Sequence, residues 1–505
     1  MMFMAWKKTI SVLLAAAVLM AALVMAACGK PAAQDIFETI TPEDRADRSL
    51  YGTGEESGTG NDAVGDRAED PGSADSGASE AEAAGTAESV GETETGPASE
   101  SAETPEDTEG FSIPEKAKYA SSSMPEYVCG AWVAGVGEYA DYPSVRTADA
   151  ASLKADCDKL LEEAQNMGIN VLFFHVRPSS DAFYPSQYYP WSRYLTGVQG
   201  LPPGDGFDPL AYMTEHAHER GIQLHAWINP YRIRTDNVDG SGIASIPIDA
   251  LINGNPALMA LRTCILPCSD GFYYLDPAEP AVREMVVNGA LEIARNYNVD
   301  GIHMDDYFYP SAGIDDSVSY AKYGGGMDIN NWRRENVNAL VRELDKRIHE
   351  VRPGLAFGIS PSGIWANKSQ SNPSGSATRG MEARNQLYAD SVTWIKNGWI
   401  DYIIPQIYWE IGKEIADYSV LVPWWCSQVE GTDVRLYIGM GDYRSMLARK
   451  NKDTGSVWYG ADELKRQVKL NDGHHAVSGE VHFNFMSISR DPALSGMYSR
   501  RYGGS

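Results

Sequence analysis

The sequence predicts an α/β protein whose folded domain, residues 119–505, is a (β/α)8 TIM barrel with long loop insertions. Three observations lead to this prediction. Short apolar segments alternate with helical patterns, eight such segments are present, and polar side chains gather where the segments end. Residues 1–27 and 28–118 differ in composition from this domain and are expected to precede the barrel.

The eight predicted strands are apolar runs, several of which follow short turn signals. They cover residues 128–136, 170–178, 223–230, 300–306, 355–363, 401–409, 434–440 and 480–488. Helical patterns fill the intervals, at residues 148–167, 209–220, 280–297, 331–351, 385–397, 413–429 and 460–470. Parallel βα units produce this alternation, and eight units fit a closed barrel better than an open sheet.

The domain is longer than a typical barrel of about 250 residues, so long insertions are expected. Two segments rich in Gly, Pro and polar or aromatic residues fit this role, residues 187–206 and 234–274.

The N-terminus predicts export. Lys7 and Lys8 precede an apolar run over residues 10–27, and small residues lead into Cys28. This order is typical of a secretory signal peptide. A retained membrane-spanning helix is the alternative, because the run approaches the length that crosses a bilayer. Either way we expect an exported and tethered protein.

The segment around the cleavage site resembles the lipobox of bacterial lipoproteins: Val24-Met25-Ala26-Ala27-Cys28-Gly29. The resemblance implies that residues 1–27 are removed and that Cys28 is acylated. It also implies a lipid-anchored, extracytoplasmic location in the bacterial cell envelope.

Residues 28–118 predict a disordered acidic linker. Between residues 31 and 110 there are 22 acidic residues and 3 arginines, so this segment carries a net charge of −19 out of −27 for the whole chain. Such a segment buries too little apolar surface to offset its ordering entropy. We interpret it as a spacer from the membrane. The low pI of about 4.7 argues against nucleic acid as a partner.

The cysteines predict neither a metal site nor a cofactor. Cys264 and Cys268 are close together in a predicted loop and could form a disulfide in an oxidising compartment. Cys129 and Cys157 lie in strand-like and helix-like contexts and are expected to be buried thiols. Since no spacing of cysteine and histidine resembles a zinc site, we expect no metal.

Polar and aromatic side chains follow five of the eight predicted strands. The carboxyl ends of barrel strands form one face, and barrel enzymes carry their active sites there. We therefore expect one site at this face. Its expected residues are Arg177, Asp181, His225, Trp227, Asn229, Arg232, His303, Asp305, Asp306, Tyr307, Trp365, Gln406, Tyr408, Trp409 and Glu410.

These residue types suit a sugar ligand. Aromatic faces pack against the C–H surfaces of sugar rings, whereas Arg, Asn, Gln and His reach hydroxyl groups; any one aromatic residue alone is more typical of core packing. Cleavage of a glycosidic bond needs carboxyl groups beside that bond. Asp305 and Asp306 are the best candidates for catalysis, and a loop-ordering pair is the alternative. Asp181, Glu410 and Asp442 are further acids at strand ends.

Four longer segments resemble the glycosyl-hydrolase-like lipoproteins of the glycosyl hydrolase-like 10 type, whose studied members cleave peptidoglycan glycan strands stripped of peptides. The segments include Val176-Arg177-Pro178, Leu224-His225-Ala226-Trp227-Ile228-Asn229-Pro230-Tyr231-Arg232, Asp300-Gly301-Ile302-His303-Met304-Asp305-Asp306-Tyr307 and Asp401-Tyr402-Ile403-Ile404-Pro405-Gln406-Ile407-Tyr408-Trp409. The resemblance runs from about residue 127 to 488 and implies a TIM barrel, a bacterial envelope location and a glycan substrate.

Two further resemblances bear on the roles of the aspartates. The pattern around Asp305 resembles the nucleophile strand of α-amylase-like barrels, but the fifth strand here ends in Ser360-Pro361-Ser362, where those enzymes have a glutamic acid. Adjacent aspartates resemble the pair of barrel enzymes that act on N-acetylated sugars. This implies Asp305 as nucleophile or polariser of the acetamido group and Asp306 as general acid/base.

The leading hypothesis is therefore a hydrolase of cell-wall glycan, most specifically of peptide-free peptidoglycan strands. A hydrolase of another polysaccharide, such as an α-glucan, is the second hypothesis. The third is a surface protein that binds carbohydrate without cleaving it.

Overall fold

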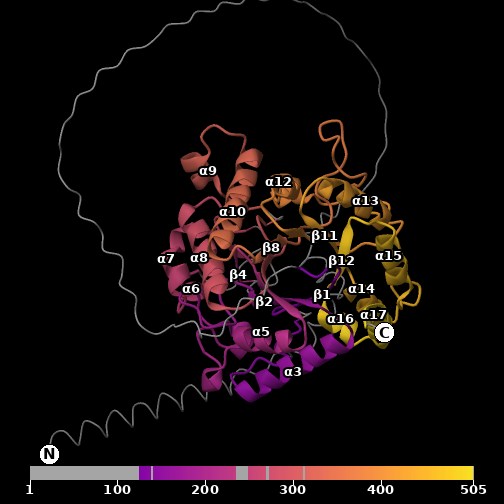
Figure 1. The fold of residues 1–505 in the computed structure, drawn as a ribbon. Helices are drawn as coiled ribbons and strands as arrows, with labels where there is room; N and C mark the ends of the chain where they lie inside the picture. The colour runs from indigo at the N-terminus through magenta and orange to yellow at the C-terminus, as the bar shows by residue number, and fades with distance from the viewer. Residues whose placement is uncertain (1–123, 138–139, 235–247, 269–271, 311–312, 504–505) are drawn as a thin grey trace, which may run out of the picture. The chain divides into compact units, whose positions relative to one another are not determined.

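The structure is a computed structural model that describes residues 124–503, apart from residues 138–139, 235–247, 269–271 and 311–312 (Figure 1). The predicted signal peptide, Cys28, the whole predicted linker and its boundary with the barrel lie outside the described residues.

Eight parallel strands form a closed barrel, as the sequence predicts. In chain order they are β1 (Val128–Val133), β2 (Val171–Arg177), β3 (Gln223–Ile228), β7 (Gly301–Met304), β8 (Ala356–Ile359), the pair β9 (Tyr402–Ile403) and β10 (Gln406–Ile407), β11 (Arg435–Met440) and β12 (Val477–His482). Each strand pairs in parallel with the next, and β1 pairs with β12 to close the ring. The sixth strand is split because Pro405 lacks an N–H and interrupts the ladder between β9 and β10.

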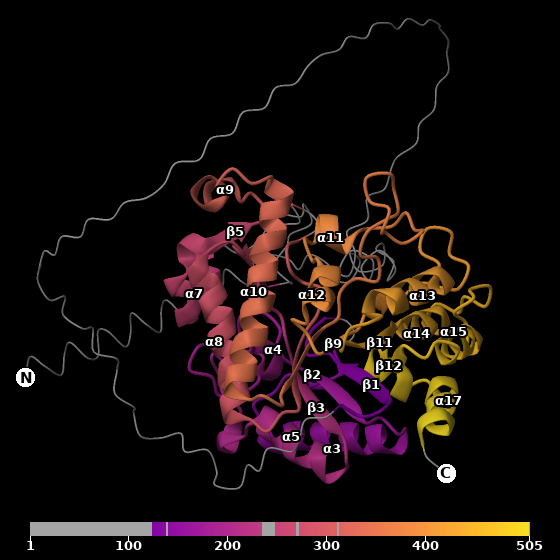
Figure 2. The ribbon, with the colours of Figure 1, turned by 45° about the horizontal axis from the view of Figure 1, so that its top comes forward.

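Helices cover the outside of the barrel (Figures 1 and 2). They are α3 (Ala150–Asn166), α5 (Pro209–Glu219), α8 (Pro280–Asn296), α10 (Ile329–Val351), α12 (Ser391–Asn397), α13 (Tyr418–Val429), α15 (Asp462–Asp472) and α17 (Pro492–Tyr502). Local sequence fixes several of their starts. Asp208 caps α5 by accepting from the backbone N–H of Leu210 at 3.0 Å, and Pro209 occupies the first turn.

The strands are buried on both faces, because their outer side chains pack under the helices and their inner side chains fill the barrel. The inner cluster includes Trp132, Phe173, Tyr402 and Tyr437. Glycine makes room for such large rings: a Cβ on Gly358 would lie 2.2 Å from the ring of Tyr402. The barrel interior is therefore a packed core and not a pore.

The structure differs from the sequence prediction mainly at the ends of elements. The predicted last strand, 480–488, ends at His482, and the short helix α16 (Phe485–Ser489) follows. The predicted helix 385–397 is two helices, α11 (Ala383–Gln386) and α12. Apolar spacing over so few residues fits a strand or a short helix equally well, which explains the error at residues 483–488.

Both predicted insertions contain short elements of their own. The second insertion includes α6 (Ile248–Ile252), α7 (Pro256–Ala260) and an antiparallel sheet of β4 (Arg232–Arg234), β6 (Tyr273–Leu275) and β5 (Ile265–Pro267). The first contains α4 (Arg193–Thr196). The described chain also has α9 (Ser317–Tyr323) and α14 (Tyr443–Lys450), which were not predicted.

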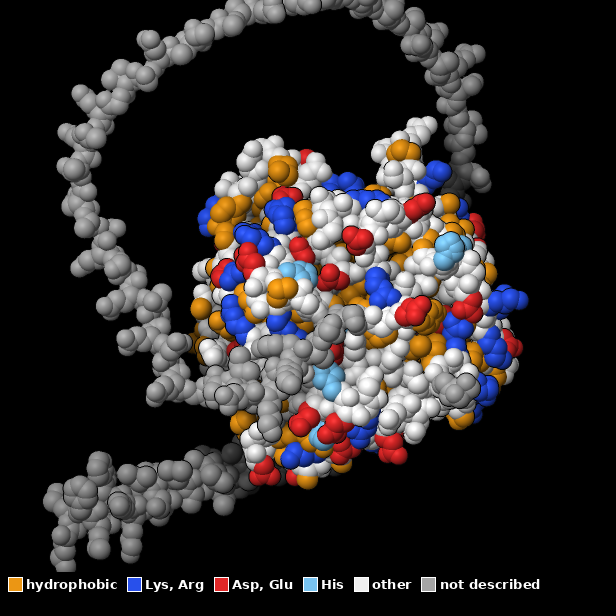
Figure 3. All heavy atoms as spheres, in the orientation of Figure 1, with side chains coloured by type: hydrophobic (Ala, Val, Ile, Leu, Met, Phe, Trp, Pro, Cys, Tyr) orange, Lys and Arg blue, Asp and Glu red, His pale blue; other side chains and the backbone are white. Residues whose placement is uncertain are grey.

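The cysteines in the described part of the chain are free thiols, including Cys264 and Cys268. The disulfide considered from the sequence is therefore not formed here. Within the described ranges, no helix has the length and apolar character needed to cross a bilayer. Figure 3 shows basic and acidic side chains interspersed over the visible face of the barrel.

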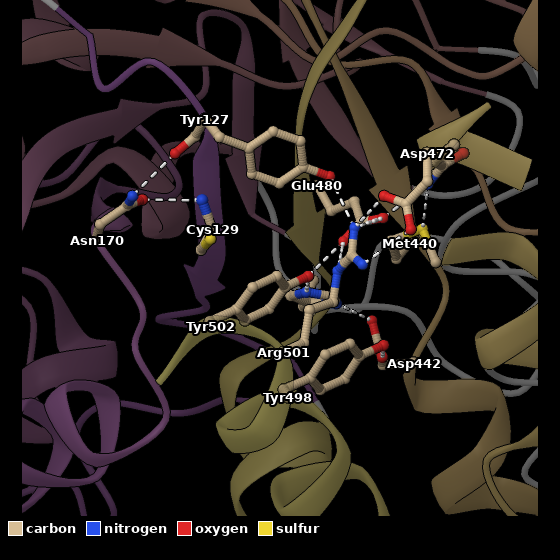
Figure 4. Close-up of polar contacts among 12 residues, drawn as sticks. Tyr127, Cys129, Asn170, Met440, Asp442, Asp472, Glu480, Tyr498, Arg501 and Tyr502 are labelled. Atoms are coloured by element: carbon tan, nitrogen blue, oxygen red, sulfur yellow. Dashed lines mark hydrogen bonds and ion pairs between the residues drawn. The ribbon is translucent and has the colours of Figure 1, made fainter. Parts of the chain in front are cut away.

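A buried polar network holds the C-terminal helix α17 against the seam between β12 and β1 (Figure 4). Glu480 on β12 has no exposed surface and accepts hydrogen bonds from Arg501 Nε at 3.0 Å, from Asn471 Nδ2 at 3.1 Å and from the Tyr502 hydroxyl. Arg501 also donates to Asp472 at 2.7 Å. One buried carboxylate thus joins β12, α15 and α17.

Glu480→Ala should lower the free energy of unfolding by about 3–5 kcal/mol, because it removes the buried acceptor shared by Arg501, Asn471 and Tyr502 and leaves Arg501 paired with Asp472 alone. Urea denaturation followed by circular dichroism measures the change. Glu414→Gln, which removes an exposed ion pair with Arg379, is the matched control and should leave the midpoint in place. Equal midpoints for both variants would show that the network does not stabilise the fold.

Candidate active site

Asp305 and Asp306 lie at the carboxyl end of β7, which ends at Met304. Side chains alternate between the two faces only within a strand, so both aspartates can turn toward the mouth of the barrel. Both are buried, with 3% and 7% of their surface exposed. The structure thus places two adjacent carboxyl groups in a nearly dry site.

Asp305 is surrounded by N–H donors. Trp227 Nε1 donates to its Oδ2 at 3.1 Å, Asn229 Nδ2 lies 2.8 Å from the same oxygen, and the backbone N–H of Tyr307 donates to Oδ1 at 3.1 Å. Burial raises the pKa of Asp305 to about 6, although the charge of Arg232 and these donors act in the opposite direction. An ionised carboxylate can accept from every one of these groups.

Asp306 has the more strongly raised pKa of the pair. Burial is the largest cause, and the neighbouring charge of Asp305 adds to it; a hydrogen bond from Gln406 acts in the opposite direction. Gln406 is itself held in place, because its Nε2 donates to the backbone oxygen of Ser360 at 2.8 Å. The arrangement favours a protonated Asp306 beside an ionised Asp305, the division of roles that an acid and a polarising or nucleophilic group require.

Arg232, at the start of β4, brings a positive charge to the two aspartates. Its guanidinium lies 4.3 Å from the centre of the Tyr307 ring, and its Nε donates to the backbone oxygen of Pro178 at 3.1 Å. Tyr307 is partly exposed, so it forms part of the wall that a ligand can reach.

His175, at the end of β2, belongs to this cluster although the sequence prediction did not include it. Its ring stacks on Trp227 with centroids 3.7 Å apart, and its Nε2 lies 2.5 Å from Asn229 Oδ1. The spacing of residues along this strand could have identified His175. His175 lies two residues after Phe173, on the same inward face of its strand.

His225 and His303 do not lie at the mouth. Both have no exposed surface, and both rings hydrogen-bond the hydroxyl of Tyr402 inside the barrel, at 2.9 Å and 3.3 Å. Trp132 Nε1 also donates to His303 at 3.1 Å. Burial lowers the pKa of each imidazole. The two histidines therefore form part of the packed layer beneath the aspartates, where they do not reach a ligand at the mouth.

Arg177 is also turned away from the mouth, because a bulge between His175 and Arg177 reverses the alternation of β2. Its guanidinium lies 4.4 Å from the centre of the Tyr189 ring and packs against α8, where a Cβ on Gly289 would come within 2.1 Å of Nη1. The expected contact of Arg177 with a ligand is thus not supported by its placement.

Asp181 orders the loop after β2. It accepts from Ser192 Oγ at 2.5 Å and from the backbone N–H of Ser179 at 3.0 Å. Burial raises its pKa to about 6. These bonds join the loop after β2 to Ser192 in the first insertion.

The remaining predicted residues lie in the loops after β8 and β10. Trp365 donates to Asp390 at 3.0 Å and stacks on Trp424, with ring centres 5.9 Å apart. Tyr408 is 1% exposed and packs against Tyr443 and Phe483.

Trp409 and Glu410 are partly exposed. Glu410 pairs with Lys413 at 3.2 Å and accepts from Trp458 Nε1 at 3.3 Å. Burial raises its pKa, but these partners outweigh burial and the net shift is downward. A carboxyl group with a lowered pKa is poorly suited to donate a proton, so Glu410 is a weak candidate for the acid.

A family model described as "Glycosyl hydrolase-like 10" matches residues 128–457. The chain belongs to the glycosyl hydrolase-like 10 family. It is 39% identical over 368 residues to glycosyl hydrolase YngK of Bacillus subtilis (strain 168), covering 72% of this chain and 68% of that protein. It is 37% identical over 368 residues to glycosyl hydrolase DigH of Escherichia coli (strain K12), covering 70% of this chain and 82% of that one.

Family membership and the closed barrel make this glycosyl hydrolase-like 10 protein a glycoside hydrolase. The family match covers the strands that carry His175, Asn229 and the two aspartates. Neither the match nor the fold assigns roles to these residues, which stay predictions.

Asp305→Asn should lower the pKa of Asp306, because it removes the neighbouring negative charge, but leave it above an ordinary carboxyl value, because burial remains. Carbon-13 NMR titration of side-chain carboxyls, assigned with Asp306→Asn, measures the shift. Glu410→Gln is the control and should leave the pKa of Asp306 unchanged. An unchanged Asp306 titration in Asp305→Asn would show that the two carboxyls do not interact.

Proposed function

We propose that this protein hydrolyses the glycan strands of bacterial cell-wall peptidoglycan after their peptides have been removed. The observation that carries the proposal is the pairing of Asp305, surrounded by N–H donors, with the adjacent and more readily protonated Asp306. Two carboxyls so close together suit a sugar that supplies its own nucleophile. Peptidoglycan sugars carry an acetamido group that can act in this way.

In the proposed first step, the Asp305 carboxylate polarises the acetamido N–H of the substrate. The acetamido oxygen attacks the anomeric carbon and forms the new C–O bond as the glycosidic C–O bond breaks. Asp306 gives its proton to the leaving glycosidic oxygen. In the second step, Asp306 takes a proton from water, which attacks the anomeric carbon and opens the cyclic intermediate. The anomeric configuration is then retained.

Arg232 and Tyr307 are the residues we assign to the binding wall beside the aspartates. The guanidinium of Arg232 also helps to keep Asp305 ionised. Trp409, which is partly exposed shortly after β10, provides aromatic surface for further sugar units.

An α-glucan hydrolase is less well supported. The residues after β8 are Ser360, Pro361 and Ser362, and Ser360 Oγ lies 3.0 Å from His303 Nε2 inside the barrel. The acid found there in α-amylase-like barrels therefore has no counterpart at this position.

We also propose that Cys28 carries a lipid and that residues 28–118 hold the barrel away from the membrane surface of the cell envelope. The support is the signal-like N-terminus and the concentration of acidic residues in this segment.

Purified peptide-free glycan strands incubated with the full chain should yield shortened saccharides, detected by mass spectrometry. Asp305→Asn and Asp306→Asn should each lower turnover by at least about 10²-fold to 10⁴-fold, the usual contribution of such groups. Glu410→Gln should keep most of the activity. Binding without cleavage by the folded parent would instead favour a carbohydrate-binding protein, and activity that depends on Glu410 would reassign the acid.

Chemical removal of the acetyl groups from the same strands should abolish cleavage while leaving binding measurable, because the internal nucleophile is lost. Product analysis of acetylated and deacetylated strands in parallel tests this. Equal cleavage of both substrates would exclude the substrate-assisted route and would make Asp305 a direct nucleophile or base.

A further inference from the structure

His175 is a buried imidazole that touches no ligand position directly but is linked to Asp305 through Asn229. It is 1% exposed and lies flat on Trp227, with the two ring planes within 6° of each other. Its Nδ1 accepts the backbone N–H of Gly135 at 3.5 Å, and its Nε2 contacts Asn229 Oδ1 at 2.5 Å. Trp227 and Asn229 are also the two side chains that donate to Asp305.

The tautomer of His175 follows from these contacts. A neutral imidazole has one N–H and one acceptor nitrogen. Because Gly135 donates to Nδ1, the ring proton resides on Nε2, and Nε2–H donates to Asn229 Oδ1. Burial and the charge of Arg232 hold the pKa of His175 well below its usual value, so the ring stays neutral.

This hydrogen bond decides which end of the Asn229 amide faces Asp305. With Oδ1 held by His175, the NH2 group points to both carboxylate oxygens of Asp305, at 3.0 Å and 2.8 Å. A half-turn of the amide would place its oxygen against Asp305. That orientation repels a carboxylate and stabilises a protonated carboxyl, because only the protonated form can donate to an oxygen.

We propose that His175 is a positioning residue for the reaction: by fixing the orientation of the Asn229 amide, it keeps Asp305 in the ionised form that the first step needs. This inference rests on the proposed function for its catalytic consequence, although the effect on Asp305 is a property of the free protein.

The other charged and titratable groups around Asp305 are Asp306 and Tyr307 next to it in the chain and Arg232 on β4. Arg232 and His303 face His175 itself. Arg232 is not altered by a change at His175, and its charge continues to favour the ionised form of Asp305. A change in the ionisation of Asp305 on substitution of His175 therefore reports on the orientation of the Asn229 amide.

His175→Phe keeps an aromatic ring to stack on Trp227 but removes the N–H. We expect the acid limb of the profile of kcat/KM against pH to move to higher pH by about one unit. At pH values below the acid limb, a shift of about one unit lowers the ionised fraction of Asp305 about tenfold, and kcat/KM falls by the same factor. KM should change little, because no proposed contact with the substrate is lost. His175→Gln, which can again donate to Asn229 Oδ1, should restore part of the shift. An acid limb that stays in place in His175→Phe would overturn the proposal.

A second measurement separates this inference from the proposed function. In the full chain with carbon-13-labelled aspartate, the Asp305 carboxyl signal, assigned with Asp305→Asn, should titrate at higher pH in His175→Phe than in the parent. This shift is expected even if no glycan is cleaved. Turnover by the parent without a shift would retain the function and remove the role of His175.

His482→Gln is the matched control. His482 is also a fully buried strand histidine, but it contacts Asp442 and Tyr502 at the seam of the barrel instead of Asn229. The His482→Gln variant should unfold at a lower temperature than the parent, and its Asp305 carboxyl should titrate at the same pH as in the parent. If His175→Phe and His482→Gln shift the titration of Asp305 equally, the shift comes from a general loss of packing and the proposal is wrong.

Discussion

The burial of two neighbouring carboxyl groups is the constraint around which the rest of the site is built. Two such groups cannot both be ionised cheaply in a dry environment, since each charge raises the pKa of the other. The protein therefore treats them differently. Asp305 receives three N–H donors and lies near Arg232, whereas Asp306 has Gln406 as its polar side-chain partner. An asymmetric environment thus gives two identical side chains different tendencies to hold a proton.

The barrel supplies this asymmetry from several strands. Asp305 follows β7, its two side-chain donors lie at the carboxyl end of β3, and the residue that orients one of them lies on β2. Gln406, on β10, approaches from the other side of β8. Because the interior beneath them is filled by rings such as Phe173 and Tyr402, these side chains have little room to rearrange. Packing below the site thus maintains the hydrogen bonds within it.

Much of the fold and the centre of the site could be predicted from the sequence, since eight apolar segments and an aspartate pair at a strand end are local patterns. The placements that the sequence does not predict are those in which the direction of a side chain depends on non-local structure. Arg177 turns outward because of a bulge in β2, which the sequence does not announce. His225 and His303 occur in the same motifs as Asn229 and Asp305, but each lies two or more residues deeper in its strand and faces the core. His175 was overlooked because its importance comes from contacts with another strand.

The network around Glu480 makes the last residues of the described chain part of what holds the barrel closed. Helix α17 begins after the final strand and could be taken for a trailing segment, yet its Arg501 and Tyr502 supply partners for a carboxylate that has no access to water. β12 also provides the only strand pairing that closes the described barrel on β1. Removal of the last residues, from Arg501 onward, would therefore leave the buried Glu480 carboxylate without its charge partner at the seam between β12 and β1. A protease that cuts before Arg501 would thus destabilise the barrel itself.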